Sequence, residues 1–244
     1  MIPSSGIGKL SAMARSAKTL EYRFVPASSG ALDRVALLLH GFGADGSDLE
    51  PLCRQIDPAG ELSWILPHAP ISFADFGFPG GRAWFPSSLE ELSQALFGGY
   101  FSNLQGLDPP GLGEGARLLR NTLRREAPEA ELVVLAGFSQ GAMVATEALL
   151  SGLLQPRLLL LFSGTLIAAD RWRRQTPPVS PRLVQTHGMQ DPILPISGGE
   201  GLHELLRGHG LPGELLRFAG GHAIPASALQ AAAQALQELS WSAR

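Results

Sequence analysis

The sequence predicts an α/β fold built on a mostly parallel central sheet with helices on both faces. Short apolar runs alternate with helix-length segments along the chain. Several runs, such as residues 35–39 and 132–135, are almost continuously hydrophobic. This pattern is typical of strands that are buried on both faces of a helix-covered parallel sheet. The chain has 244 residues, of which 45% are hydrophobic and 17% charged, and this size and composition suit one large α/β domain.

The apolar runs and the segments between them predict the elements in order along the chain. Seven runs predict strands, at residues 22–26, 35–40, 63–67, 131–137, 157–162, 182–187 and 215–218. Five other segments predict helices, at residues 47–56, 113–125, 140–151, 198–207 and 225–239. In the second of these, Leu118, Leu119, Thr122 and Leu123 form one stripe. Pro225 suits the first turn of the last helix, where a missing N–H costs nothing.

The two ends of this pattern indicate how the chain is organised. Residues 1–19 are rich in small residues and precede the first apolar run, so we expect a flexible leader outside the fold. They lack the apolar stretch of a secretory signal, and a cleaved targeting peptide is the alternative. Residues 20–244 contain neither a repeat nor an interior linker, which predicts a single domain. No stretch reaches the ~20 apolar residues of a membrane span.

Residues 71–112 interrupt the alternation of strands and helices. The segment is punctuated by Gly and Pro and holds eight of the chain's 17 aromatic residues. These are Phe73, Phe76, Phe78, Trp84, Phe85, Phe97, Tyr100 and Phe101. Two compatible interpretations are an irregular excursion with a small core of its own and a cap-like insertion over an apolar substrate site. In the second, the candidate substrate-binding side chains are Trp84, Phe85, Phe73 and Phe76.

The charge and the cysteine content narrow the choice of partners. The net charge of −3 gives no electrostatic reason to expect nucleic acid or an anionic membrane as a partner. Cys53 is the only cysteine, so the chain can form no intrachain disulfide and no cysteine-based metal site. That content fits a reducing compartment, and we expect a cytoplasmic protein.

Residues 137–141, Gly-Phe-Ser-Gln-Gly, form a G-x-S-x-G between a predicted strand and a predicted helix. This is the context of a nucleophile elbow, a turn so tight that side chains two residues before or after Ser139 would collide. The turn presents the hydroxyl at the carboxyl edge of the sheet, where the helix N-terminus offers N–H groups to a developing anion. The alternative is a junction at which Ser139 merely caps the helix.

A serine hydroxyl is a poor nucleophile until an adjacent base accepts its proton. After an elbow of this kind, an acid and then a histidine are expected along the chain. Asp191 follows the strand predicted at 182–187, and His222 follows the strand predicted at 215–218. Parallel strands end at one edge of the sheet, so Ser139, Asp191 and His222 are predicted to meet there as nucleophile, orienting acid and general base.

The other histidines and acids fit the triad less well. We expect His40 and His187, each at a strand end beside a glycine, to brace turns by hydrogen bonding. His68, between two prolines at 67 and 70, is expected to be structural or to line the cap. Three aspartates lie away from the expected strand end and are weaker candidates for the acid: Asp45, Asp48 and Asp170.

Acyl transfer also needs hydrogen-bond donors for the negative oxygen of the tetrahedral intermediate, each worth ~3 kcal/mol. One candidate is the N–H of Gln140, next to the nucleophile. The other is the N–H of Phe42, in the loop His-Gly-Phe-Gly after the strand predicted at 35–40. A plain glycine turn is the alternative interpretation of that loop.

Taken in order, four segments resemble the phospholipase/carboxylesterase family, which includes bacterial carboxylesterases and the acyl-protein thioesterases. They are Leu-Leu-His-Gly-Phe-Gly at 38–43, Gly-Phe-Ser-Gln-Gly-Ala at 137–142, His-Gly-Met-Gln-Asp-Pro-Ile-Leu-Pro at 187–195 and Gly-His-Ala-Ile-Pro at 221–225. Pro-His-Ala-Pro at 67–70 and Trp-Phe at 84–85 are similar to its motifs as well. The likeness spans roughly residues 30–240.

The resemblance implies the α/β-hydrolase fold, the triad of Ser139, Asp191 and His222, and oxyanion donors at Phe42 and Gln140. It implies hydrolysis of carboxylic esters or thioesters, with an apolar channel beside the triad where the substrates are lipidated. Two features depart from the family pattern. Residues 220–225 look more like the bacterial esterases than the acyl-protein thioesterases, and the aromatic excursion is longer than the family leads us to expect.

We therefore expect a serine carboxylesterase or thioesterase-like hydrolase that forms an acyl-enzyme on Ser139 and takes a small-molecule or lipid-like acyl ester. Two rival functions stay open: hydrolysis of another electrophile, of lactone or dienelactone type, and a non-catalytic binding module of the same fold. Serine chemistry needs neither a metal nor an organic cofactor, so none is expected. The sequence is compatible with a monomer or a homodimer, since an apolar rim around the cap would support a dimer.

Overall fold

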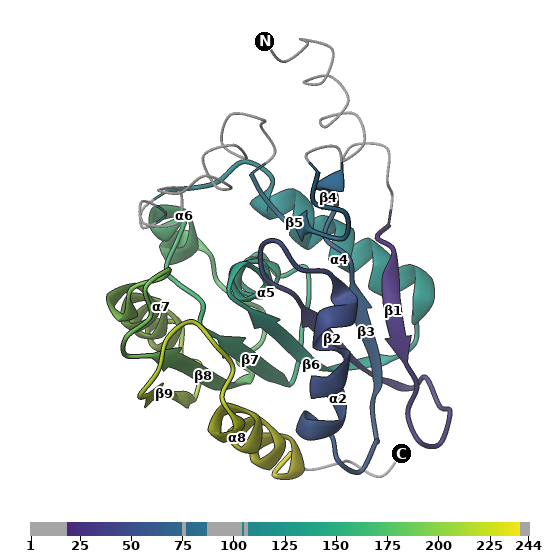
Figure 1. The fold of residues 1–244 in the computed structure, drawn as a ribbon. Helices are drawn as coiled ribbons and strands as arrows, with labels where there is room; N and C mark the ends of the chain where they lie inside the picture. Colours follow the sequence, from purple (N-terminus) through teal and green to yellow (C-terminus); the bar gives the residue numbers. More distant parts are fainter. Residues whose placement is uncertain (1–18, 75–76, 87–103, 105–106, 240–244) are drawn as a thin grey trace.

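The computed structural model describes residues 19–74, 77–86, 104 and 107–239, and Figure 1 shows them around a twisted central sheet. The sheet has seven strands in the order β1-β3-β2-β6-β7-β8-β9. Their bounds are β1 Tyr22–Val25, β2 Arg34–Leu39, β3 Ser63–Pro67, β6 Glu131–Phe138, β7 Leu158–Phe162, β8 Arg182–Gly188 and β9 Gly213–Phe218. β1 pairs antiparallel with β3, and all other neighbours pair in parallel. The predicted mostly parallel sheet is confirmed.

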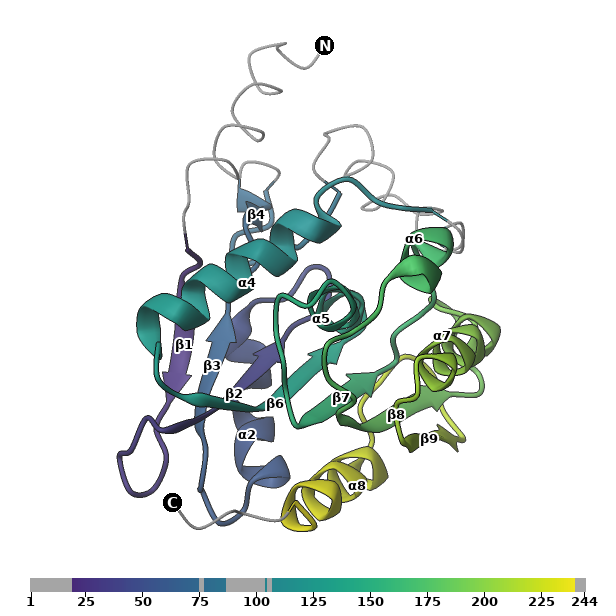
Figure 2. The same cartoon turned by 180° about the vertical axis from the view of Figure 1, so that it is seen from behind.

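Helices cover both faces of this sheet, as predicted. They are α2 Glu50–Ile56, α4 Leu112–Glu126, α5 Gln140–Leu150, α6 Ala169–Arg174, α7 Ile196–Gly208 and α8 Ala226–Gln237, with a 3-10 helix η1 at Gly46–Leu49. α2 and α8 lie on one face, and α4, α5 and α7 on the other, as the two opposite views in Figures 1 and 2 show.

The central strands β2, β3, β6 and β7 are buried on both faces because almost every residue in them is apolar. In β2, Leu37 and Leu39 pack into the core cluster that contains α4 and α5, whereas Ala36 and Leu38 pack into the cluster that contains α2 and α8. All four side chains are fully buried. Alternate side chains of a strand point to opposite faces, so one apolar run supplies both cores.

Several short elements differ from the predicted ones. The segment expected as one helix at 47–56 begins as the 3-10 helix η1 and continues as the α-helix α2. Asp45 starts η1 by accepting a hydrogen bond from the Ser47 N–H. The last helix begins at Ala226, with Pro225 as the residue before its first turn. The sequence did not predict α6, nor the hairpin formed by β4 (Ile71–Ser72) and β5 (Arg82–Ala83).

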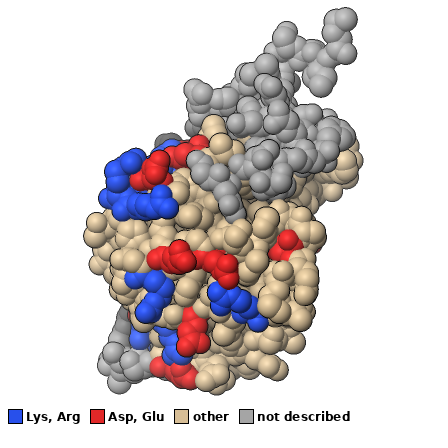
Figure 3. Space-filling view, turned by 90° about the vertical axis from the view of Figure 1, so that its left-hand side faces the viewer, with Lys and Arg blue, Asp and Glu red and all other residues tan. Residues whose placement is uncertain are grey.

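Two expected segments lie wholly or partly outside the described residues: the leader at 1–19, of which residue 19 alone is described, and half of the excursion at 71–112. None of the helices in the described ranges is long and apolar enough to cross a bilayer. Figure 3 shows the side that carries α6, α7 and β9, where positive and negative side chains are interspersed. On that side Arg217 pairs with Glu200, and Arg171 pairs with Asp108. A single-sign patch of the kind a polyanion binds is absent from the described part of that face.

Candidate active site

Ser139 lies in a strained turn between β6 and α5. Its backbone has φ 54° and ψ −117°, in a region that residues with a side chain seldom adopt. The flanking glycines make the turn possible. A Cβ added at Gly137 would lie 2.4 Å from the Gly141 backbone, and one added at Gly141 would lie 2.3 Å from the Leu39 carbonyl oxygen. The sequence G-x-S-x-G is therefore a steric requirement of this turn.

The Ser139 hydroxyl does not cap the helix that follows it. Ser139 is the residue before the first turn of α5, yet its side chain makes no capping hydrogen bond. This excludes the alternative in which the serine is a helix cap. The residue is 5% exposed, so the hydroxyl lies in a largely water-excluded place at the N-terminus of α5.

Asp191 and His222 are joined as predicted. His222 Nδ1 lies 2.6 Å from Asp191 Oδ2, and since a carboxylate oxygen accepts, Nδ1 carries the proton. Nε2 is then the nitrogen left to act as a base. The other carboxylate oxygen, Asp191 Oδ1, accepts from the backbone N–H groups of Ile193 and Leu194, each at 2.9 Å. The acid is thereby fixed in position by its own loop.

The loops that carry the acid and the base are held together along their backbones. The Met189 N–H donates to the Phe218 carbonyl, and the Gln190 N–H donates to the Gly220 carbonyl, both at 2.9 Å. Gly188 permits this approach, since a Cβ there would lie 2.2 Å from the carbonyl oxygen of Gly221. Local backbone packing therefore brings Asp191 and His222 together.

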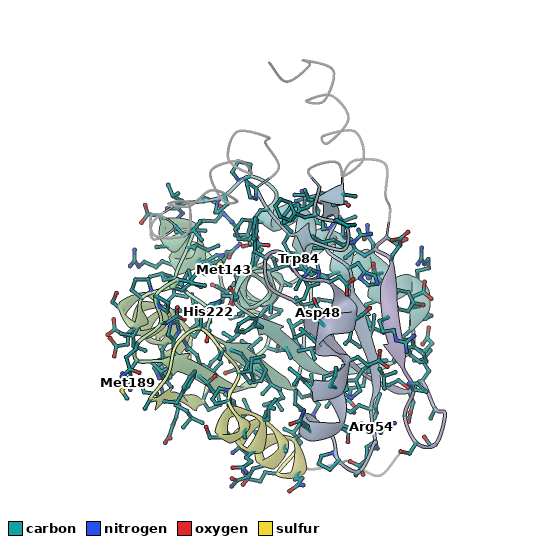
Figure 4. The ribbon with its side chains drawn as sticks, in the orientation of Figure 1. Asp48, Arg54, Trp84, Met143, Met189 and His222 are labelled. Atoms are coloured by element: carbon teal, nitrogen blue, oxygen red, sulfur yellow. The ribbon has the colours of Figure 1, made fainter. Side chains whose placement is uncertain are left out.

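His222 comes from the loop between β9 and α8 (Figure 4). The ring centroids of His222 and Phe138 are 4.8 Å apart. In the described structure no hydrogen bond joins the hydroxyl of Ser139 to the imidazole of His222. Catalytic hydrogen bonds of substrate-free enzymes are often long and tighten only when substrate binds.

The loop predicted to supply an oxyanion donor, residues 40–43, runs beside the nucleophile. A Cβ added at Gly41 would lie 3.3 Å from the Cβ of Ser139. His40, which is fully buried, braces the loop: its Nδ1 lies 2.7 Å from the Gly41 carbonyl, and its Nε2 accepts from the Ala69 N–H at 3.0 Å. Burial lowers the pKa of His40 to about 4, so the ring is neutral at physiological pH. Phe42 follows this braced turn.

His187 also braces a turn, as the sequence suggests. Its Nε2 donates to the Leu194 carbonyl at 2.8 Å and lies 3.5 Å from Asp191 Oδ2. The ring is fully buried and packs against Gly199, where a Cβ would lie 2.5 Å from Nδ1. His68 has a structural role, because its Nδ1 accepts from the Gly46 N–H at 3.2 Å.

Three of the four aromatic residues expected to bind substrate are described, and all three are buried. Phe73 and Trp84 are each 1% exposed, and Phe85 is fully buried. The Phe73 ring packs on Phe42, with centroids 5.0 Å apart. Phe76 lies outside the described residues. The three described side chains therefore form part of the packed support of the site rather than its exposed surface.

Two contributors to the site went unnoticed in the sequence. Ser163, in a left-handed conformation with φ 50° at the end of β7, donates a hydrogen bond of 3.2 Å to the carbonyl of Ala223, beside His222. The side chain of Gln140 is fully buried and bonds to the backbone of the segment after β5. The one available signal for Ser163 was its place at a strand end followed by glycine.

The candidate site offers no obvious set of metal ligands. In the described ranges, no group of three or more His, Cys, Asp or Glu side chains is placed to hold a metal ion. Cys53 is buried between α2 and the sheet, and burial raises the pKa of its thiol to about 12, which suits a packing residue.

Comparisons with known proteins identify relatives of this chain. A sequence model of the phospholipase/carboxylesterase family matches residues 20–240. Acyl-protein thioesterase 1 from Gibberella zeae is 30% identical over 193 residues, which cover 71% of this chain and 76% of that protein.

Similar solved structures extend over most of the chain. Esterase PE8 is 28% identical, with a TM-score of 0.73 over 90% of this chain and 99% of the other. Zea mays acyl-protein thioesterase 2 is 21% identical, with a TM-score of 0.67 over 89% and 97%. The Bacillus cereus carboxylesterase is 19% identical, with a TM-score of 0.67 over 94% and 99%. The last two show a shared fold alone.

Proposed function

The chain belongs to the phospholipase/carboxylesterase family of α/β-hydrolases, and from that premise we propose that it cleaves carboxylic esters or thioesters through an acyl-enzyme on Ser139. The observation that supports this most is the 2.6 Å hydrogen bond from His222 to Asp191, formed next to a strained serine whose hydroxyl caps nothing. A purely structural serine and histidine would need neither the strain nor the pairing.

The proposed reaction has two steps. Ser139 Oγ attacks the carbonyl carbon while His222 Nε2 accepts its proton, and Asp191 stays ionised and stabilises the imidazolium that forms. The tetrahedral intermediate collapses, the bond to the leaving group breaks, and His222 gives the proton to the departing alcohol or thiol. A water, deprotonated by His222, then attacks the acyl-enzyme and releases the acid, with the proton returned to Ser139.

The proposed oxyanion donors are the backbone N–H groups of Gln140 and Phe42. Gln140 is the first residue of α5, and the first N–H groups of a helix have no acceptor within the helix. The partial positive charge of the helix N-terminus adds to the stabilisation of the anion. The loop that carries Phe42 runs beside Ser139, since a Cβ added at Gly41 would lie 3.3 Å from the Ser139 Cβ.

An apolar acyl chain is the proposed substrate feature. Phe42 of the proposed oxyanion loop is partly buried and packs on Phe73, and Phe78 of the β4–β5 hairpin is 53% exposed. An apolar surface of this kind stabilises a bound acyl chain by about 0.8 kcal/mol for each CH₂ removed from water. A relative named acyl-protein thioesterase 1 supports the same substrate class.

The test is ester hydrolysis by the purified protein and by Ser139→Ala. We expect Ser139→Ala to lower kcat by about 10³-fold or more, since the nucleophile is gone. Ser180→Ala is the control, because it removes an exposed hydroxyl that donates to the Gly210 carbonyl. Ser180 precedes the amino end of β8, whereas the candidate site lies at the carboxyl ends of the strands. Turnover by Ser139→Ala at the rate of the unaltered protein would rule the mechanism out.

The same preparation tests the acyl preference. In a series of p-nitrophenyl esters from acetyl to palmitoyl, kcat/KM is expected to peak at medium or long chains, and thioesters of the same acids separate the two leaving groups. A peak at acetyl contradicts the apolar acyl proposal. Hydrolysis of lactones in preference to all of these esters would favour the rival electrophile.

A further inference from the structure

Residues 82–86, here called the strap, lie between the loop after β2 and the start of α5. On one side they pair with the loop after β2: the Gly43 N–H donates to the Arg82 carbonyl at 2.8 Å, and the Arg82 N–H donates to the Ala44 carbonyl at 3.1 Å. On the other side they contact the start of α5. The strap therefore touches both chain segments that carry a proposed oxyanion donor.

Trp84 makes the two central contacts of the strap. Its indole N–H donates to the His40 carbonyl at 2.9 Å, and its backbone N–H donates to Gln140 Oε1 at 2.9 Å. The Gln140 amide in turn donates to the Phe85 carbonyl, so both ends of that amide are bound to the strap. Trp84 is 1% exposed and Gln140 is fully buried, so water cannot replace these bonds.

The partners of these bonds are adjacent to the proposed donors. His40 lies two residues before Phe42 in a turn whose histidine ring is itself bonded at both nitrogens. Gln140 carries the other donor on its own backbone. One residue, Trp84, thus connects the supports of both N–H groups, although 44 positions separate it from His40 and 56 from Gln140.

We propose that Trp84 and the Gln140 side chain are positioning residues that set the distance and angle between the two oxyanion donors. The proposal rests on the function proposed above. An oxyanion hole works when its donors are preorganised to within about 0.5 Å of the productive geometry. A strap bonded to both supports fixes their separation.

The proposal differs from the expectation that Trp84 binds substrate. A side chain that contacts the acyl group would chiefly change KM when altered. One that positions the donors changes transition-state binding, so its alteration lowers kcat and leaves KM almost unchanged.

The test compares Trp84→Phe with Trp172→Phe. The first substitution keeps most of the side-chain volume and the backbone N–H but removes the bond to the His40 carbonyl. Trp172 is the matched control, because it lies on α6, remote from Ser139. It is fully buried, and its indole N–H donates to Glu147 at 2.7 Å. We expect kcat to fall about 10-fold or more in Trp84→Phe, with KM within twofold, and to stay within twofold of the unaltered protein in Trp172→Phe.

A second pair of variants addresses the amide. Gln140→Met removes both bonds to the strap at nearly constant volume and leaves the backbone N–H in place. Gln185→Met is its control, since Gln185 is also fully buried and donates at 2.7 Å to the Gly199 carbonyl. The expected loss in kcat, about 10-fold, is confined to Gln140→Met, and circular dichroism and urea unfolding establish that each variant is folded.

Affinity for a trifluoromethyl ketone, which forms a tetrahedral adduct, is the decisive readout. It should weaken in Trp84→Phe and Gln140→Met by the same factor as kcat. An unchanged affinity together with an unchanged kcat overturns the proposal, as does an equal loss in the Trp172 and Gln185 controls. A raised KM at constant kcat would assign Trp84 to substrate binding. Failure of the proposed function has a separate signature, turnover that survives in Ser139→Ala.

Discussion

His40 shows how much of this site depends on a residue outside the triad. Its carbonyl accepts from Trp84, its Nδ1 proton goes to Gly41, and its Nε2 accepts from Ala69. This pattern can exist only for the neutral ring, because a protonated Nε2 could not accept. Burial is the chief reason that its pKa falls to about 4. Protonation of His40 would therefore break the hydrogen bond from Ala69 that holds the loop at residues 40–43.

The pKa of His40 predicts how stability changes with pH. The ordinary value, 6.5, applies in the unfolded chain, and about 4 applies in the folded one. Between these values the unfolded state binds more protons, so the free energy of unfolding falls as the pH falls from 6.5 towards 4, by at most about 3 kcal/mol. In His40→Asn, which retains an N–H near the position of Nδ1, this part of the pH dependence should be lost.

Urea unfolding measured from pH 7 to pH 4 checks this expectation. The charged groups that act on His40 are His68, Asp45 and Asp48, and all three are present in both proteins. His209→Asn controls for the loss of a histidine elsewhere. Equal slopes for His40→Asn and the unaltered protein would show that His40 does not titrate in this window.

At the residue scale, the sequence predicted the side chains whose residue type and motif point to a chemical role. Ser139, Asp191 and His222 were predicted as the triad from motif and order along the chain. The support residues were not, because their role depends on partners far away in the sequence. The Gln140 amide bonds to a strap 56 positions earlier, and Ser163 bonds to a carbonyl 60 positions later. No local pattern signals such a contact.

The sequence predicted the strand and the helix of the elbow between β6 and α5 to within one residue at each end. The strand was expected at 131–137 and the helix at 140–151, and the structure has Glu131–Phe138 and Gln140–Leu150. Long apolar runs and periodic helices are specified locally. η1 and the β4–β5 hairpin were missed because two to four residues carry too little periodic signal, and their form depends on Asp45 and on pairing with neighbouring chain.

The steric account of the elbow predicts the effect of Gly141→Ala. The added methyl would lie 2.3 Å from the Leu39 carbonyl oxygen and 2.7 Å from that of His40. Both are backbone atoms in or next to a buried strand and cannot move aside. We expect a loss of about 3 kcal/mol in the free energy of unfolding, with displacement of the elbow.

Gly208→Ala is the control for that substitution. Gly208 is the last residue of α7, and an added Cβ meets no atom within 4 Å. The variant should be neutral or more stable by up to about 1 kcal/mol, since alanine is the better helix former. Urea denaturation of both variants measures the difference, and equal midpoints would contradict the account.

At the scale of the whole molecule, the order of strands assembles the site. β2, which leads to the proposed oxyanion loop, lies next to β6, which leads to the proposed nucleophile. β8 and β9, which lead to the proposed acid and base, follow on the other side of β7. Ligands of open parallel sheets bind outside the carboxyl ends of the strands, where these loops meet. The sequence indicated that the strands are parallel, but their order depends on long-range pairing that no single run encodes.

The central claim, an activated nucleophile at Ser139, is tested most directly by labelling with a fluorophosphonate probe. The unaltered protein and Ser139→Ala are treated side by side, and the labelled peptide is identified by mass spectrometry. The account predicts one modified peptide, containing Ser139, and no labelling of Ser139→Ala, while Ser163→Ala, which removes another buried serine of positive φ, is still labelled at Ser139. Labelling at a different residue, or equal labelling of Ser139→Ala, would contradict it.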